Sequence, residues 1–408
     1  MKAILMLLLA AALGLNMMAA QGEVSGKKSE DYEPLYELAE NYGFKLGACY
    51  SYGQLRDKTY LEFVGRHFNS LTCTNETKAY SLLDQRASVK SEDGMPRMNY
   101  ASADKMLAWA RDNGISVRGH VLVWDAYMTE WFFHEDYNVS RPIADKETMR
   151  LRLKSYIEQV IEHFETSFPG VIYCWDVVNE AIGESLMEYD AKDLRRVRTM
   201  RDGKRNPFYD YVGEDYVEYS FLCARDAVEK LGADVKLFYN DYNMFFSAKR
   251  DAACRLIDSI NSYAADENGD FRRLIDGVGM QGYVGGYGTQ AGCMANADIA
   301  SIKNSILMYA GHDVEVQITE MAVRNYDLSK ADKHAEFYGN LFKMFRSINQ
   351  NAEGNPLTAV CIWGVMDCDS LPKTNYSWKM NSPYGGLITE KYEIKTTFDA
   401  VYHVLKGE

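Results

Sequence analysis

Two glutamates stand where apolar runs typical of buried strands come to an end. Val171–Val178 is followed by Asn179 and Glu180, and Glu315–Thr319 is followed by Glu320. Cleavage of a glycosidic bond needs one carboxylic acid to protonate the leaving oxygen and one carboxylate to meet the anomeric carbon. Asn179 adds a short amide that suits a sugar hydroxyl. The pair therefore indicates a glycosidase, although either glutamate alone could be a salt-bridged surface residue.

A repeated strand-and-helix pattern would position these residues. Short apolar runs alternate with longer segments of helical period, which is the sequence form of βα units. We expect eight strands, at Lys45–Tyr50, Ser70–Thr74, Ser116–Trp124, Val171–Val178, Val235–Asn240, Gly277–Gly282, Glu315–Thr319 and Thr358–Trp363. We expect helices at Ala101–Asn113, Thr148–Thr166, Tyr216–Leu231, Ala252–Asp266, Ile299–Ala310, Lys330–Ile348 and Thr396–Leu405.

Eight is the number at which parallel strands close around a filled interior. We therefore predict an α/β fold with a single (β/α)8 TIM barrel. The active sites of such barrels lie at the carboxyl ends of the strands, so Glu180 and Glu320 are expected to face each other across the mouth. The distance between the two carboxyl groups decides between retention and inversion of configuration, and the sequence leaves that distance open.

The first residues are typical of a secretory signal peptide. Lys2 precedes an apolar run, Ala3–Leu15, and the small residues Ala19 and Ala20 follow it. The run is shorter than the roughly 20 residues that a membrane span needs. We predict a signal peptide at 1–20, a catalytic barrel at 21–408, and export to the periplasm or the medium.

The composition favours a neutral partner and no cofactor. A net charge of -13 without runs of basic residues disfavours nucleic acid and anionic membranes. Spacing of cysteine and histidine typical of a metal site is absent from the sequence, so we expect neither a metal nor a cofactor, and a monomer. Four cysteines fall in predicted strands and are expected to be buried, namely Cys49, Cys73, Cys174 and Cys361. Pairing among the other four is open, namely Cys223, Cys254, Cys293 and Cys368.

Several ordered motifs resemble those of glycoside hydrolase family 10, whose members are mostly endo-β-1,4-xylanases. The two main ones are Trp175-Asp-Val-Val-Asn-Glu180 and Ile318-Thr-Glu320. Others are Phe68-Asn-Ser-Leu-Thr72, Arg118-Gly-His120, Leu122-Val-Trp124, Phe238-Tyr-Asn-Asp-Tyr-Asn243, Ile275-Asp-Gly-Val-Gly-Met-Gln281 and Ile362-Trp-Gly-Val365. The resemblance covers nearly the whole chain after the signal peptide. It implies a retaining endo-β-1,4-xylanase that acts on plant xylan by double displacement.

Carried over to this sequence, the resemblance makes Glu180 the acid/base and Glu320 the nucleophile. It also implies a set of residues that line the sugar sites, namely Asn75, Lys78, His120, Trp124, Asn179, Gln281 and Trp363. Without the resemblance, His120 and Trp124 would be interpreted as core residues. Asp241 matches an aspartate of the family and could help to hold the acid/base proton, although a simple hydrogen bond at the rim is equally consistent.

Four positions depart from the family pattern. Thr74 replaces a glutamate, Asp125 a histidine, and Leu371 a tryptophan, while Tyr283 stands where a histidine normally bonds the nucleophile. A phenol can donate a hydrogen bond to a carboxylate as an imidazole does, so Tyr283 remains a predicted site residue. The departures leave two alternatives to xylan hydrolysis. One is an enzyme acting on a decorated xylan, another β-glycan or a plant glycoside, and the other is a glycan-binding protein without turnover.

Overall fold

The strands form one closed ring of parallel pairs. The computed structural model describes residues 23–183, 206–288, 298–368 and 382–408. Its strands are β1 (Lys45–Tyr50), β2 (Ser70–Cys73), β3 (Ser116–Gly119), β4 (Ile172–Asn179), β5 (Lys236–Asp241), β6 (Gly277–Tyr287), β7 (Glu315–Asn325) and β8 (Leu357–Ile362). They close in sequence order, and β8 pairs with β1. Because the pairs are parallel, all the carboxyl ends lie at the same rim.

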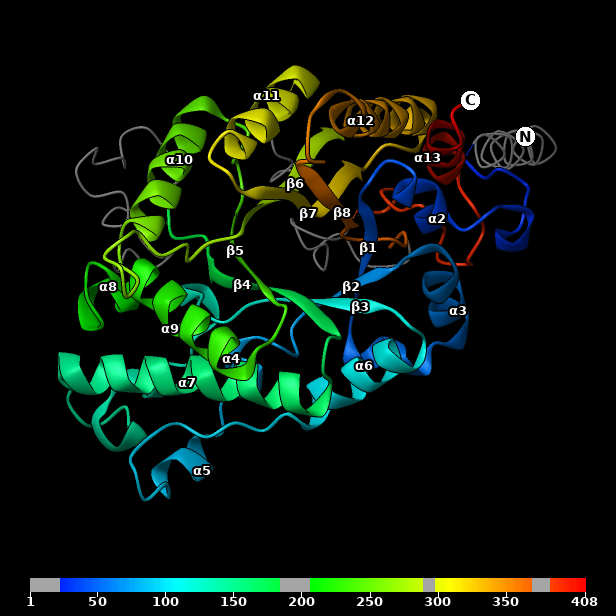
Figure 1. The fold of residues 1–408 in the computed structure, drawn as a ribbon. Helices are drawn as coiled ribbons and strands as arrows, with labels where there is room; N and C mark the ends of the chain where they lie inside the picture. The colour runs from blue at the N-terminus through cyan, green and yellow to red at the C-terminus, as the bar shows by residue number, and fades with distance from the viewer. Residues whose placement is uncertain (1–22, 184–205, 289–297, 369–381) are drawn as a thin grey trace, which may run out of the picture.

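The long helices surround this ring, and short ones lie in the connections (Figure 1). In the described ranges they are α2 (Leu35–Glu40), α3 (Lys58–His67), α4 (Ala79–Leu82), α5 (Gln85–Val89), α6 (Ala101–Asp112), α7 (Lys146–Ser167), α8 (Pro207–Tyr211), α9 (Tyr216–Leu231), α10 (Ser247–Asn261), α11 (Ile299–Ala310), α12 (Ala331–Asn351) and α13 (Thr396–Lys406). The buried residues of α9 include Val217, Phe221, Ala224 and Val228, spaced every three or four positions as on an amphipathic helix. The predicted (β/α)8 barrel is confirmed.

Four predicted elements differ clearly from the structure. The strands expected at Gly277–Gly282 and Glu315–Thr319 continue to Tyr287 and Asn325, five and six residues further. The strand expected at Ser116–Trp124 ends at Gly119, and the chain passes a cis peptide bond between His120 and Val121. Leu122 and Val123 then donate backbone hydrogen bonds to β4 again, at 3.0 and 2.9 Å, so the segment still borders that strand outside the regular ladder.

The helix expected at Ala252–Asp266 is α10, which begins five residues earlier, at Ser247, and ends at Asn261. Beyond its end, the Asp266 carboxylate accepts the backbone N–H groups of Asn268 and Asp270 at 2.8 and 3.0 Å. Such a local side-chain bond favours a turn over a continued helix.

The cysteines that were expected to be buried are buried in β1, β2, β4 and β8. Cys223 and Cys254 are buried free thiols as well, and Cys293 lies outside the described residues. The predicted signal peptide also lies outside them. None of the helices that the structure describes is both long and apolar enough to cross a bilayer.

Candidate active site

Glu180 follows an irregularity at the end of β4. Between Asp176 and Val178, β4 advances two positions while β5 advances one, from Phe238 to Tyr239. A bulge of this kind changes the direction of the side chains that follow it. Glu180 itself is buried and has a left-handed backbone with φ of 54°, which is uncommon for a residue that carries a Cβ.

Tyr239 holds the backbone that follows Glu180. Its hydroxyl oxygen accepts the N–H groups of Ala181 at 3.0 Å and Ile182 at 3.1 Å. The same hydroxyl donates to Asp241 Oδ2 at 2.6 Å. All three bonds are buried, where a lost partner costs most. Tyr239 therefore fixes the turn that aims the Glu180 side chain.

Asp241 and Lys249 form a buried ion pair next to Glu180. Lys249 Nζ donates to Asp241 Oδ1 at 2.7 Å, and both side chains are at most 2% exposed. Burial raises the pKa of the Asp241 carboxyl, the neighbouring Glu180 raises it further, and Lys249 opposes both. Lys249 also lies 3.8 Å from the ring centroid of Tyr242. The carboxylate of Asp241, balanced by the ammonium of Lys249, thus lies beside the predicted acid/base.

Glu320 lies in a bulge of β7. From Thr319 to Ala322, β7 advances three positions, while β6 advances two, from Gln281 to Tyr283. Glu320 is buried and also left-handed, with φ of 53°. A strained residue of this kind costs roughly 1 to 3 kcal/mol and persists where its surroundings enforce it, often at functional sites. Both predicted catalytic glutamates share this conformation.

Tyr283 makes the hydrogen bond that was expected of it. Its phenol O–H donates to Glu320 Oε2 at 2.5 Å, and its buried ring packs against Cys49, Ala322 and Trp363. Burial raises the pKa of the Tyr283 phenol well above its usual value, and the Glu320 charge and hydrogen bond raise it further. The partner of Glu320 is thus a neutral donor that keeps its proton at any ordinary pH.

Amide side chains link the two glutamates. Asn240 Nδ2 donates to Asn179 Oδ1 at 2.8 Å and to Glu320 Oε1 at 3.3 Å. Gln281 Nε2 donates to the same Asn179 oxygen at 3.2 Å and to Glu180 Oε1 at 2.9 Å. Since one continuous set of hydrogen bonds reaches both carboxyl groups, they belong to the same site.

Two polar atoms of this network are left over. Asn179 Nδ2 and Gln281 Oε1 are buried and have no hydrogen-bond partner among the described residues. Buried polar atoms are seldom left in this state, and a sugar hydroxyl could pair with either. Gly279 makes room for the network, because a Cβ there would lie 2.2 Å from Asn240 Oδ1.

His120 is oriented by a buried charge pair. Its Nδ1 lies 2.8 Å from Asp176 Oδ2, and its Nε2 lies 3.9 Å from Glu320 Oε1. Burial would raise the pKa of the Asp176 carboxyl, but Arg118, which pairs with it, and His120 together hold that pKa below its usual value. A persistent Asp176 carboxylate therefore fixes the ring of His120 beside Glu320.

The other predicted sugar-site residues lie around His120 and beside one another. The ring centroids of Trp124 and Trp363 are 5.7 and 6.3 Å from that of His120. Lys78 Nζ donates to Asn75 Oδ1 at 3.3 Å and lies 5.1 Å from the Trp124 ring centroid. The structure thus brings all ten predicted site residues to one end of the barrel.

Of the other departures, two are described. Thr74 is buried at the end of β2, and its hydroxyl has no hydrogen-bond partner among the described residues. Asp125 is buried, and its Oδ1 accepts the N–H of Ala126 at 2.9 Å. Leu371 lies outside the described residues.

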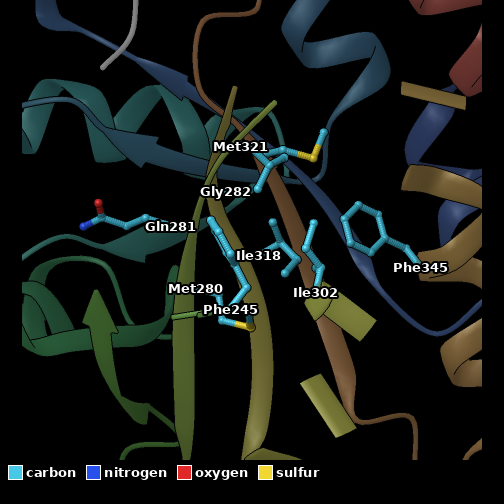
Figure 2. Close-up of a pocket in the computed structure, with 9 residues that line it drawn as sticks. Phe245, Met280, Gln281, Gly282, Ile302, Ile318, Met321 and Phe345 are labelled. Atoms are coloured by element: carbon cyan, nitrogen blue, oxygen red, sulfur yellow. The ribbon is translucent and has the colours of Figure 1, made fainter. Parts of the chain in front are cut away.

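A small apolar gap lies behind the site, on the helix side of β6 and β7. It is lined by Phe245, Met280, Ile302, Ile318, Met321 and Phe345, together with Gln281, Gly282 and Val284. Figure 2 shows the Gln281 amide pointing away from the other labelled side chains. A Cβ at Gly282 would lie 2.9 Å from the Met321 Cα, so glycine allows β6 and β7 to approach closely here. The gap is a packing defect, and the chemistry lies on the opposite side of β6.

Sequence reasoning missed several supporting residues. Asn240 and Tyr239 were recognised only as part of a motif, and Lys249, Asp176 and Arg118 were given no role in the site. A signal for Lys249 exists, because it shares a helical face with the buried residues Ala252, Ala253 and Leu256. A lysine on such a face is seldom buried without a partner.

The arrangement provides two carboxyl groups, aligned by amides, in a site lined with aromatic rings. One group can donate a proton while the other meets an electron-deficient carbon, as glycosidic cleavage requires. Within the described residues there is no cluster of histidine, cysteine, aspartate or glutamate that suits a metal ion. The described geometry therefore supports acid/base and nucleophilic chemistry by side chains.

Comparisons with known proteins agree with this geometry. The model of Glycosyl hydrolase family 10 matches residues 34–404. A protein of Caldicellulosiruptor saccharolyticus is 36% identical over 316 residues, which are 74% of this chain and 92% of that protein. Endo-1,4-beta-xylanase B of Butyrivibrio fibrisolvens is 31% identical over 369 residues, which are 89% of this chain but only 52% of the relative.

Solved structures are similar as well. The structure of the Clostridium thermocellum endo-1,4-beta-D-xylanase 10B with its CBM22-1 and GH10 modules, complexed with xylohexaose, has a TM-score of 0.76 and 26% identity, covering 91% of this chain and 68% of that one. An intracellular xylanase from Thermoanaerobacterium saccharolyticum has a TM-score of 0.70 and 28% identity, covering 91% and 98%.

Proposed function

Because the chain belongs to glycosyl hydrolase family 10, we propose that it is a retaining endo-β-1,4-xylanase that hydrolyses plant xylan. The observation that carries the proposal is the hydrogen-bonded array that joins Glu180 and Glu320 through Asn179, Asn240 and Gln281. The names of the similar proteins support xylan as the substrate. A binding protein without turnover would have no need of both strained glutamates.

In the proposed mechanism the reaction has two steps. Glu320 attacks the anomeric carbon while Glu180 gives its proton to the leaving oxygen, which forms a glycosyl-enzyme. Glu180 then removes a proton from water, and the water displaces Glu320 with net retention. Tyr283 and Asn240 would hold the Glu320 carboxylate, one at each oxygen, so that it approaches the carbon in one orientation.

Product analysis tests this function. Wild type and Glu320→Ala would be incubated with linear xylan, arabinoxylan, glucuronoxylan and mixed-linkage β-glucan. We expect short xylo-oligosaccharides from wild type alone, with the β-anomer formed first in proton NMR. Early α-anomer would contradict retention. Failure to cleave any of the four polymers would direct attention to a plant glycoside or to glycan binding.

We further propose that the protein is exported and acts as a monomer on glycan, without nucleic acid or membrane as a partner. Lys2 and the apolar run Ala3–Leu15 support export, and the net charge of -13 disfavours polyanionic partners. Cell fractionation tests export, and light scattering of the purified protein tests the monomeric state. A cytosolic protein or a stable dimer would contradict them.

A further inference from the structure

We infer that the aromatic side chains of Trp124, Tyr127 and Tyr80 form a track that extends the glycan site outward past the ends of β2 and β3. The inference rests on the proposed function and specifies which part of the chain would bind a longer substrate. Its occupant is the neutral sugar chain of the β-linked glycan, beyond the units that Glu180 and Glu320 contact.

The rings form a continuous series that starts at the reacting carboxylate. His120 Nε2 lies 3.9 Å from Glu320, and the His120 and Trp124 ring centroids are 5.7 Å apart. The Trp124 and Tyr127 centroids are 4.4 Å apart, and those of Tyr127 and Tyr80 are 5.4 Å apart.

Exposure rises along this series. Trp124 is 5% exposed, Tyr127 37% and Tyr80 42%. Tyr80 and Tyr127 are both exposed large side chains in the described part of the protein, and their rings lie side by side. Tyr127 ends the short 3-10 helix Asp125–Tyr127 after β3, and Tyr80 lies in the first turn of α4 after β2, so both stand at the active-site end of the barrel.

Polar groups accompany the rings. Lys78 Nζ lies 4.3 Å from the Tyr127 centroid and 5.1 Å from the Trp124 centroid, and it donates to Asn75 Oδ1 at 3.3 Å. Thr74, in the same β2–α4 connection, has a buried hydroxyl without a partner among the described residues. Aromatic faces beside hydroxyl-binding donors and acceptors suit a pyranose, which has an apolar C–H face and a polar edge.

Lys78 also prepares the track for binding. An ammonium group near two ring faces is attracted to both and restricts the ring of Tyr127. Little side-chain entropy is then lost when a sugar arrives, so contact at Tyr127 favours binding more than contact at a freely rotating ring would. Contacts this far from the reacting carbon are expected to be equally strong in the ground and transition states, and so to act on KM.

The family resemblance places Asn75 and Lys78 on the non-reducing side of the site, and Lys78 lies beside Tyr127 of the track. Aryl β-glycosides of xylobiose, xylotriose and xylotetraose therefore test the track, because they share a leaving group and lengthen only on that side. Tyr80→Ala and Tyr127→Ala should leave kcat/KM for the disaccharide within about twofold of wild type. For the tetrasaccharide, we expect a loss of roughly three- to tenfold through KM, which corresponds to about 0.6 to 1.4 kcal/mol of binding free energy. Tyr80→Phe and Tyr127→Phe should retain the length dependence.

The matched control is Phe271→Ala, because Phe271 is 76% exposed and precedes β6 at the opposite end of the barrel. A gain in kcat/KM with chain length that is the same in wild type and in both alanine variants would overturn the track and leave the proposed function intact. An equal loss on every length would also overturn it. Absence of wild-type turnover of every xylo-oligosaccharide glycoside would overturn the proposed function and the track together.

Discussion

The hydrogen bond from Tyr283 to Glu320 leads to a prediction that separates the role of the hydroxyl from that of the ring. Tyr283→Phe removes one buried O–H and keeps the packing against Cys49, Ala322 and Trp363. Glu320 Oε2 then loses its 2.5 Å donor, while Oε1 keeps Asn240 at 3.3 Å. The substitution therefore weakens the hold on the ionised carboxylate without opening a large cavity.

The expected size follows from the charge of the acceptor. A hydrogen bond to a charged group contributes about 1.5 to 3 kcal/mol, and each 1.36 kcal/mol of activation free energy corresponds to a tenfold change in rate. Because the O–H fixes one oxygen of the carboxylate, its loss leaves the nucleophile less well oriented toward the anomeric carbon. We therefore expect kcat/KM for an aryl β-xylobioside to fall by about 10- to 100-fold in Tyr283→Phe.

Tyr156→Phe serves as the control, since the Tyr156 hydroxyl is buried in α7 without a hydrogen-bond partner among the described residues. Both variants should keep their thermal unfolding temperature within a few degrees. A Tyr283→Phe enzyme with wild-type kcat/KM would refute the reasoning. So would an equal loss of kcat/KM in Tyr156→Phe.

Two further predictions concern buried charges. Lys249→Met leaves Asp241 buried without its 2.7 Å partner, so we expect a loss of about 3 to 5 kcal/mol in the free energy of unfolding at pH 7. The loss should be partly recovered as the pH falls, because burial raises the pKa of the Asp241 carboxyl and favours its protonated form. Exposed Lys230→Met is the control, and equal stability of the two variants would contradict this prediction. Burial, together with the nearby Glu23 charge, raises the pKa of Asp367 to about 7, despite Lys395 at 2.7 Å. Because this folded pKa exceeds the unfolded one, the Asp367 carboxyl contributes most to the free energy of unfolding below about pH 4. This contribution is lost as the pH rises to about 7. Asp367→Asn should therefore make the stability decline between pH 4 and 7 shallower, by at most about 1.4 kcal/mol per pH unit in urea titrations, and an unchanged slope would contradict the assignment.

The sequence was sufficient to predict the barrel because the spacing of apolar residues and the residue types of the strands indicate the same elements along the chain. Tyr216–Leu231 and Ile299–Ala310 have the predicted bounds, since each has an apolar stripe of helical spacing and ends before glycine. The break after Gly119 could not be foreseen, because Val121, Leu122 and Val123 are as apolar as a strand requires. An apolar run indicates that a segment is buried, and residues 121–123 are buried without forming a regular ladder.

The active site, like the fold, was predicted from the sequence only in part. Residue type and position at strand ends identified Glu180, Glu320 and Asn179, because a polar residue after an apolar run is conspicuous. The bulges in β4 and β7 cannot be recognised in the sequence, since the extra residue is apparent only when two strands are paired. The left-handed φ of both glutamates depends on those bulges and on neighbours such as Tyr239, which come from other strands.

Tyr283 illustrates what pairing adds to a sequence departure. By residue type alone, a phenol in place of an imidazole could have turned away from the carboxylate or displaced it. In the structure, Tyr283 stands opposite Ala322 in the β6–β7 ladder, and Trp363 and Cys49 complete the contact around its ring. A small residue at 322 and apolar neighbours hold the Tyr283 hydroxyl at Glu320, its hydrogen-bond acceptor among the described residues. Packing and the hydrogen bond from Tyr283, a group that does not titrate near neutrality, thus orient one oxygen of the nucleophile, while Asn240 holds the other. A change in the size of residue 322 should therefore disturb the position of Glu320 as surely as loss of the hydroxyl.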